Sequence, residues 1–173
     1  MGSTAIEAIA EYHNDVDRSL RLYFSEASPS FNTRFFGFRP EEIRKQLNER
    51  LEETDQRSAF VILTRLEAAF FTDYECRCKK KIKDGGLSKA FRAIPRSRNA
   101  RVRLNDILDA WKESKPGLRR QLSDLRGAFD FRNWFAHRRY TEPEPKPGGK
   151  YDFDSFYGLA DSVLSTFPLR KFD

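Results

Sequence analysis

Residues 118–138 read LRRQLSDLRGAFDFRNWFAHR and carry the clearest helical pattern of the chain. Apolar side chains recur every three or four residues, at Leu118, Leu122, Leu125 and Phe129. This spacing aligns one apolar stripe along a helix. The next stripe position is Arg132, where a charge costs free energy unless it is paired or reaches solvent in a cleft. The pattern predicts a helix and marks Arg132 as a functional candidate; the alternative is a side chain whose stem covers apolar surface.

The same helical spacing recurs in the rest of the chain, and no segment alternates as a strand does. Asp55 is expected to cap or interrupt the chain between two helices, and 141–150 is a Pro- and Gly-rich connector. We expect an all-α fold, a four-helix bundle with additional short helices. The further helices are expected at about 4–24, from Pro40 onward, and at 59–83, 87–93, 104–112 and 152–167.

Length and composition favour one soluble domain, residues 1–173, with 39% hydrophobic and 34% charged residues. No apolar run approaches the roughly 18 residues needed to span a bilayer, and the first residues lack the basic region of a secretory signal. Cys76 and Cys78 are two apart in an expected helix, where they point to different faces. We therefore expect two reduced thiols, a cytoplasmic location and no membrane association.

Positive charge is concentrated in residues 77–103, which hold eleven basic residues against Asp84 alone. This segment carries +10, so the rest of the chain sums to −4 within a net charge of +6. Such concentration is typical of a surface that binds a polyanion, and the alternative is a solvated face that keeps the protein soluble. The residues we expect to bind RNA are Lys79, Lys80, Lys81, Lys83, Arg96, Arg98, Arg101 and Arg103.

The segment RNWFAH, residues 132–137, holds an arginine, an amide and one of the two histidines of the chain. Arginine keeps its charge in proteins, and its guanidinium matches phosphate oxygens. Histidine takes or gives a proton near neutral pH. Arg132 and His137 therefore have the chemistry to cleave a phosphodiester without a metal, one for the charge and one for the proton. The structural alternative for His137 is a cation at the negative end of the helix dipole.

RNWFAH fits the pattern Arg-Asn-x-x-x-His and lies late in a helical chain of this length. In this setting it resembles the HEPN superfamily (higher eukaryotes and prokaryotes nucleotide-binding domains), most of whose active members are ribonucleases. The resemblance implies a dimeric helical bundle with both motifs in one cleft, and metal-independent RNA cleavage that leaves 2′,3′-cyclic phosphate. It also implies a toxin, a host-defence effector or an RNA-processing factor. By position, Arg132 binds phosphate, Asn133 positions the substrate and His137 transfers the proton.

The spacing within the motif bears on how a site could form. Asn133 and His137 are four residues apart and share one helix face. Arg132 and His137 lie about 140° apart around a regular helix, so they do not naturally converge. We therefore expect a single protomer to make a poor site and a C2 dimer through this helix to complete it.

Segment 59–83 supplies second-tier candidates, namely Glu67, Asp73 and Arg77. The resemblance implies that another helix adds an acidic or polar residue to the cleft, and we choose Glu67. The alternative for Glu67 is a solvent-facing carboxylate or an ion pair within its own helix.

The residues around the motif depart from the family in two ways. Many HEPN toxins have a tyrosine two residues after the histidine, whereas Tyr140 comes third here. Many others have a glycine directly after the histidine, where this chain has Arg138, which could add phosphate affinity or mark a different exit of the chain. Arg138 and Tyr140 are further second-tier candidates. We expect Trp134 and Phe135 to pack in the core or in a dimer interface.

Three functions compete at this point. The first is an endoribonuclease in a toxin–antitoxin or host-defence setting, with RNA as substrate and an antitoxin or regulatory protein as a further partner. The second is a non-catalytic module that binds RNA or a nucleotide. The third is a protein–protein adaptor, in which Arg132 is paired inside one protomer and nucleic acid is ignored. No cofactor or metal is expected, because neither the two distant histidines nor the cysteine pair makes a zinc site.

Overall fold

The computed structural model describes residues 3–80, 82, 84, 86–94, 102–137 and 152–172, with side chains from Ile6 onward. All regular structure in these ranges is helical, which confirms the all-α prediction. The elements are α1 (Ser3–Tyr23), α2 (Phe31–Arg34), α3 (Pro40–Lys80), α4 (Leu87–Ala93), α5 (Leu104–Ser114), the 3-10 turn η1 (Pro116–Leu118), α6 (Arg119–His137) and α7 (Phe153–Thr166). No helix within these ranges has the length and apolar content that crossing a membrane requires.

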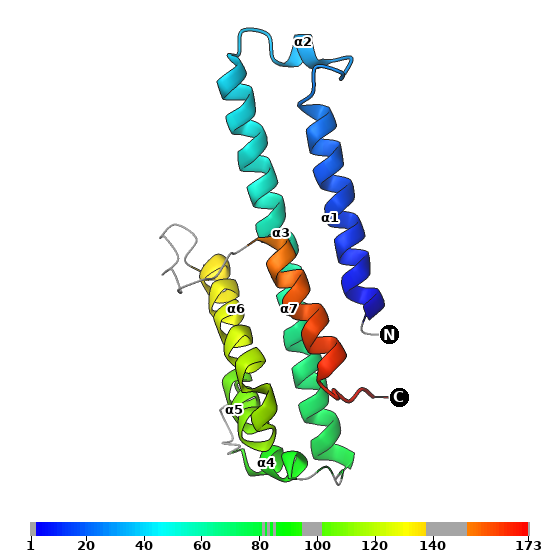
Figure 1. Ribbon diagram of the computed structural model, residues 1–173, viewed down its shortest axis with the longest axis vertical. Coiled ribbons are helices and arrows are strands. Elements are labelled where there is room, and N and C mark those ends of the chain that lie inside the picture. The colour runs from blue at the N-terminus through cyan, green and yellow to red at the C-terminus, as the bar shows by residue number, and fades with distance from the viewer. Residues whose placement is uncertain are drawn as a thin grey trace.

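Helix α3 is the axis of the molecule, and the other long helices lie along it (Figure 1). Helix α1 runs beside the first part of α3 and extends past this part. Helices α6 and α7 pack along the second part of α3, with α4 and α5 near the end of α3. The upper parts of α1 and α3 project beyond α6 and α7 as a pair joined by α2. The first buried residue of α3 is accordingly Ser58, eighteen positions after Pro40.

The interruption expected at Asp55 is wrong, because α3 is continuous over its 41 residues. After Pro40 at its first position the helix has no glycine or proline. Local contacts support it: the Thr54 hydroxyl donates to the carbonyl of Arg50, and Arg57 pairs with Glu53 at 2.9 Å. Asp55 itself lies 3.5 Å from Nε2 of His13 on α1. Aspartate is a poor helix former in isolation, and here a tertiary contact overrides that propensity.

The core lies where α6, α7 and α5 cover the second part of α3. Trp111 of α5 is fully buried, and its ring lies 6.4 Å from Phe70 of α3 and 5.2 Å from Phe167. Fully burying side chains of this size removes the largest apolar areas from water and dominates the stability of the packing. This core is the rigid base on which the second part of α3 presents its side chains.

Candidate functional site

Arg132 of α6 faces α3, where it forms a two-pronged ion pair with Glu67. Its Nη1 donates to Oε2 of Glu67 at 2.6 Å and its Nη2 donates to Oε1 at 3.1 Å. The pair is partly open, since 18% of the Arg132 side chain and 24% of the Glu67 side chain are exposed. The charge on the apolar stripe is therefore compensated by a partner on another helix and still has contact with solvent.

Asn133 and His137 lie on the exposed side of α6. Both are exposed, four residues apart, and His137 is the last residue of the helix. Within the described part of the chain, no hydrogen bond or ion pair engages the His137 ring. Its nitrogens are thus accessible, while Arg132 points to α3. The two groups do not converge within one protomer, as the helical geometry predicts.

Aromatic contacts fix the rotation of α6 and hence the direction of the motif. The ring of Phe135 lies 5.9 Å from that of Phe60 on α3, and buried Phe131 stacks on Phe156 of α7 at 5.2 Å. Trp134 is half-buried and lies 5.5 Å from Phe131. These rings hold the end of α6 against both α3 and α7, so the exposed face of Asn133 and His137 is set by core packing.

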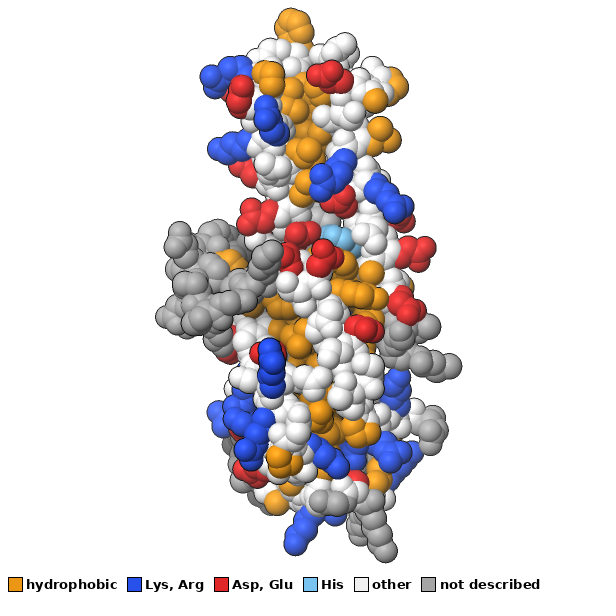
Figure 2. All heavy atoms as spheres, viewed as in Figure 1, with side chains coloured by type: hydrophobic (Ala, Val, Ile, Leu, Met, Phe, Trp, Pro, Cys, Tyr) orange, Lys and Arg blue, Asp and Glu red, His pale blue; other side chains and the backbone are white. Residues whose placement is uncertain are grey.

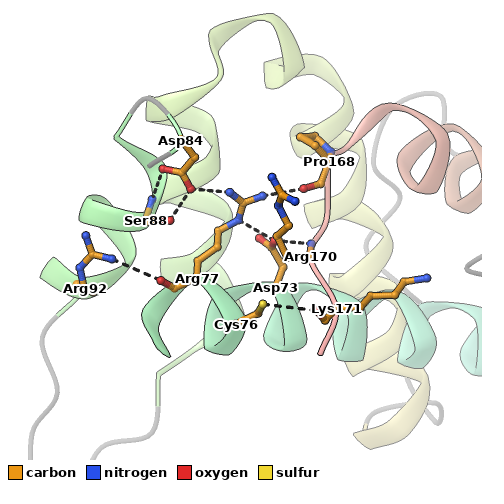
Figure 3. Close-up of polar contacts among 9 residues, drawn as sticks. All are labelled: Asp73, Cys76, Arg77, Asp84, Ser88, Arg92, Pro168, Arg170 and Lys171. Atoms are coloured by element: carbon orange, nitrogen blue, oxygen red, sulfur yellow. Dashed lines mark hydrogen bonds and ion pairs between the residues drawn. The ribbon is translucent and has the colours of Figure 1, made fainter. Parts of the chain in front are cut away.

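Asp73 and Arg77, the other second-tier candidates, lie elsewhere in a buried network (Figure 3). Nε of Arg77 donates to Oδ1 of Asp73 at 2.7 Å, Nη1 to Oδ2 of Asp84 at 2.5 Å, and Nη2 to the carbonyl of Pro168 at 2.7 Å. Oδ1 of Asp73 also accepts the backbone N–H of Arg170 at 2.7 Å. The network ties the end of α3 to residue 84 and to the segment after α7, and it contains neither Arg132 nor Glu67.

Burial and hydrogen bonds compete at the two carboxyls of this network. Burial raises the pKa of Asp73, and the bonds from Arg170 and Arg77 only partly offset it. For Asp84, burial also acts to raise the pKa, but the bonds from Ser88 and Arg77 outweigh it and hold the pKa below its usual range. The difference follows from exposure, since the Asp84 side chain reaches solvent and that of Asp73 does not.

The basic residues expected to bind RNA are described only in part. Lys79 and Lys80 at the end of α3 and Arg103 before α5 are exposed. On the face shown in Figure 2, Lys and Arg side chains lie on both the upper and the lower part of the molecule, and Asp and Glu side chains are most frequent at mid-height. The remaining candidates lie outside the described residues: Lys81, Lys83, Arg96, Arg98, Arg101, Arg138 and Tyr140.

A buried histidine cluster was not foreseen. Nδ1 of His13 lies 3.1 Å from the hydroxyl of Ser58, and its ring stacks on Phe153 at 3.7 Å. Asp55 contacts the opposite ring nitrogen. Burial, more than any neighbouring charge, raises the pKa of Asp55. The cluster joins α1, α3 and α7, and no spacing in the sequence indicates it, because the three contributions are far apart along the chain.

A cavity at the end of α3 was also missed, although its signal is present. Phe71, Tyr74 and Cys78 follow Glu67 at intervals of four, three and four residues, so they continue one stripe along α3. Together with α4 they line a cavity of about 910 Å³. The stripe therefore connects the Arg132–Glu67 pair with a hollow of ligand size.

Comparisons with protein-family models, with curated proteins and with solved structures give no match to this chain. The class of protein that the fold defines is an all-α protein with an Arg-Asn-x-x-x-His motif at the end of a helix. The likeness to the HEPN superfamily accordingly rests on the motif and its helical setting.

Proposed function

We propose that this protein is a metal-independent endoribonuclease that acts in a toxin–antitoxin or host-defence setting. The observation that carries the proposal is the Arg132–Glu67 pair, which holds a partly open guanidinium one residue away from the exposed Asn133–His137 face. An oriented arginine and an accessible histidine have the chemistry for the charge stabilisation and the proton transfer that phosphodiester cleavage needs.

In this mechanism His137 accepts the proton of a ribose 2′-hydroxyl. The 2′-oxygen attacks the adjacent phosphorus, the bond to the 5′-oxygen breaks, and the product is a 2′,3′-cyclic phosphate. Arg132 has five N–H donors, of which Glu67 engages two, so further donors remain for the phosphoryl oxygens. Asn133 orients the phosphate from the same face as His137.

The departing 5′-oxygen needs a proton from a second acid. Because His137 of one protomer acts as the base and lies apart from Arg132, we propose that His137 of a second copy, in its protonated form, supplies this proton. The copies form a C2 homodimer of four-helix bundles, joined through α6, with a composite site between the two motifs. An antitoxin or regulatory protein controls access to this site.

One observation favours a second candidate, the non-catalytic adaptor. Arg132 is paired inside one protomer, as that function requires. A guanidinium fully engaged by Glu67 would serve to join α6 to α3 and nothing more. The two candidates differ in what removal of His137 does, because the His137 ring has no structural partner in the described residues.

Purified wild type, His137→Ala and Arg132→Ala proteins, incubated with labelled single-stranded and structured RNAs in EDTA, test the proposal. Arg120→Ala, an exposed arginine in the first turn of the same helix, is the matched control. We expect wild type and the control to leave cyclic phosphate ends. His137→Ala should be slower by about 10²–10⁴-fold, the usual contribution of a general base.

The outcomes separate the functions. Equal cleavage by wild type and both motif variants would contradict the assigned roles. Salt-sensitive RNA binding without cleavage by any protein would favour the non-catalytic RNA-binding module. Absence of both binding and cleavage would favour the adaptor.

A further inference from the structure

One edge of α3 runs from the candidate site to the cavity at the end of the helix. Glu67, Phe71, Tyr74 and Cys78 recur at intervals of four, three and four residues and so lie one above another. At 1.5 Å per residue, Glu67 and Cys78 are separated by about 16 Å along the axis. Phe71 and Cys78 pack against the core and are half-buried, so the edge is an ordered surface.

The cavity combines an aromatic and apolar lining with two cations. Phe71, Tyr74 and Val102 contribute the rings and the aliphatic surface, and Cys78 contributes a free thiol. Lys79 and Arg92 bring positive charge, and Glu75 brings one carboxylate, so the charged part of the lining is net positive. Its volume of about 910 Å³ falls in the usual range of ligand pockets, roughly 300–1,000 Å³.

The two cations are only weakly neutralised. The sole hydrogen bond of Arg92 in the described chain goes to the backbone carbonyl of Arg77 at 3.4 Å (Figure 3). Arg92 forms no ion pair with a described carboxylate. Lys79 pairs with Glu75 at 3.6 Å, but both side chains are more than half exposed, so this pair contributes little. The cavity thus offers an anion two cationic contacts, Lys79 and Arg92, next to aromatic side chains.

We propose that this cavity binds a nucleobase of single-stranded RNA, a few nucleotides from the phosphate held at Arg132 and His137. The inference rests on the proposed ribonuclease function and adds a base-binding subsite to it. Rings stack on bases of any sequence, and arginine and lysine hold the flanking phosphates. A paired duplex cannot present a base in this way, so the cavity favours unpaired RNA.

The position of the cavity explains why a base, and not an isolated apolar ligand, is the fitting occupant. An apolar molecule would leave Arg92 without an anion as water is excluded. An RNA strand that follows the edge of α3 from Glu67 fits both the cations and the rings of the cavity. Its phosphates pass the cations while one base turns toward Phe71 and Tyr74. The same strand links the chemistry at α6 to recognition at α3.

The test uses full-length His137→Ala protein, so that RNA stays intact during the measurement. Binding of a labelled unstructured RNA of about ten nucleotides, within the usual site size of single-strand binders, is measured by fluorescence anisotropy with and without Phe71→Leu. Leucine keeps the aliphatic packing and removes the ring. Phe36→Leu is the matched control, because Phe36 is 89% exposed at the far end of the molecule.

We expect Phe71→Leu to weaken binding on the order of tenfold, from the loss of one stacking contact, and Phe36→Leu to leave it unchanged. An RNA with one abasic position should bind the protein with Phe71 intact more weakly by the same factor. In the Phe71→Leu protein the abasic position should cause no further loss of affinity. Bound RNA should also slow alkylation of Cys78, since Cys76 is buried and Cys78 is the accessible thiol.

The failure of the subsite and the failure of the ribonuclease are distinguishable. RNA that binds equally to Phe71→Leu and leaves Cys78 alkylation unchanged would overturn the base pocket while the cleavage assay still decides the enzyme. No RNA binding by either protein, together with no cleavage by wild type, would overturn both. Protection of Cys78 by an apolar peptide but not by RNA would assign the cavity to a protein partner and overturn the proposal.

Discussion

Two arginine–carboxylate contacts on α3 look alike and behave differently. Arg77 and Asp73 are 3% and 0% exposed, and Arg77 also engages Asp84 and the carbonyl of Pro168. Arg132 and Glu67 are 18% and 24% exposed, and among the described residues no other side chain forms a hydrogen bond or ion pair with this guanidinium. All three nitrogens of Arg77 are used, whereas Nε of Arg132 is buried without a partner in the described residues. The first arginine is committed to structure, and the second retains capacity for a ligand.

Breaking the buried contact should have the largest effect. Arg77→Met leaves Asp73 buried without its cation, and removal of one partner from a buried pair costs about 3–5 kcal/mol. Arg57→Met is the matched control, because Arg57 makes the same i,i+4 contact with Glu53 but is 73% exposed. We expect the control to cost less than about 1 kcal/mol. Urea unfolding followed by circular dichroism measures both, and equal costs would contradict the comparison.

The pH dependence of the same network gives a smaller effect of known sign. The pKa of Asp84 is held below its usual range by bonds from Ser88 and Arg77, against the effect of burial. Its contribution is therefore present above the unfolded pKa of about 3.9 and is lost as the pH falls through the folded value. Burial raises the pKa of Asp73, so that group acts in the opposite sense, favouring the folded state as the pH falls toward 3.9.

Asp84→Asn isolates the Asp84 contribution, since asparagine keeps the shape and removes the charge. The variant should be less stable than wild type at neutral pH, and the difference should shrink as the pH is lowered below about 4. Urea unfolding at a series of pH values measures it. A difference that stays constant with pH would mean that Asp84 contributes through hydrogen-bond geometry and not through its charge.

Most of the helices were predictable from sequence because they present a periodic apolar stripe, whereas the four-residue α2 was not expected. The helix 87–93 was expected at the residues where α4 is found, and the motif helix differs from α6 by one residue at each end. The continuity of α3 through Asp55 was not predictable, because the contact with His13 comes from a helix some forty residues away. A local pattern predicts where a helix forms, but it does not show where a tertiary contact overrides the helix propensity of a single residue.

The candidate site was likewise predictable only in part. Arg132 stood out because it falls on an apolar stripe, and Glu67 was chosen on the likeness to a family; the structure places the two together. Asp73 and Arg77 lie on the same helix as Glu67, yet their environment is set by Asp84 and by the segment after α7. Spacing along one helix does not reveal such contacts. Which side of a helix is covered is a property of the packed molecule.

The smallest effect on stability is expected at the contact that matters most for function. Glu67→Gln keeps an acceptor for Arg132 and removes the charge from a pair that touches solvent on both sides. We expect a loss below about 1 kcal/mol, diminishing further in high salt, because water reaches both side chains and screens the pair in part. Urea unfolding at low and high ionic strength measures it. A loss as large as that of Arg77→Met would mean that Glu67 commits Arg132 to joining α6 and α3, which leaves no capacity for phosphate and favours the adaptor. A small loss leaves the guanidinium free to exchange a carboxylate for a phosphoryl group, as the ribonuclease proposal requires.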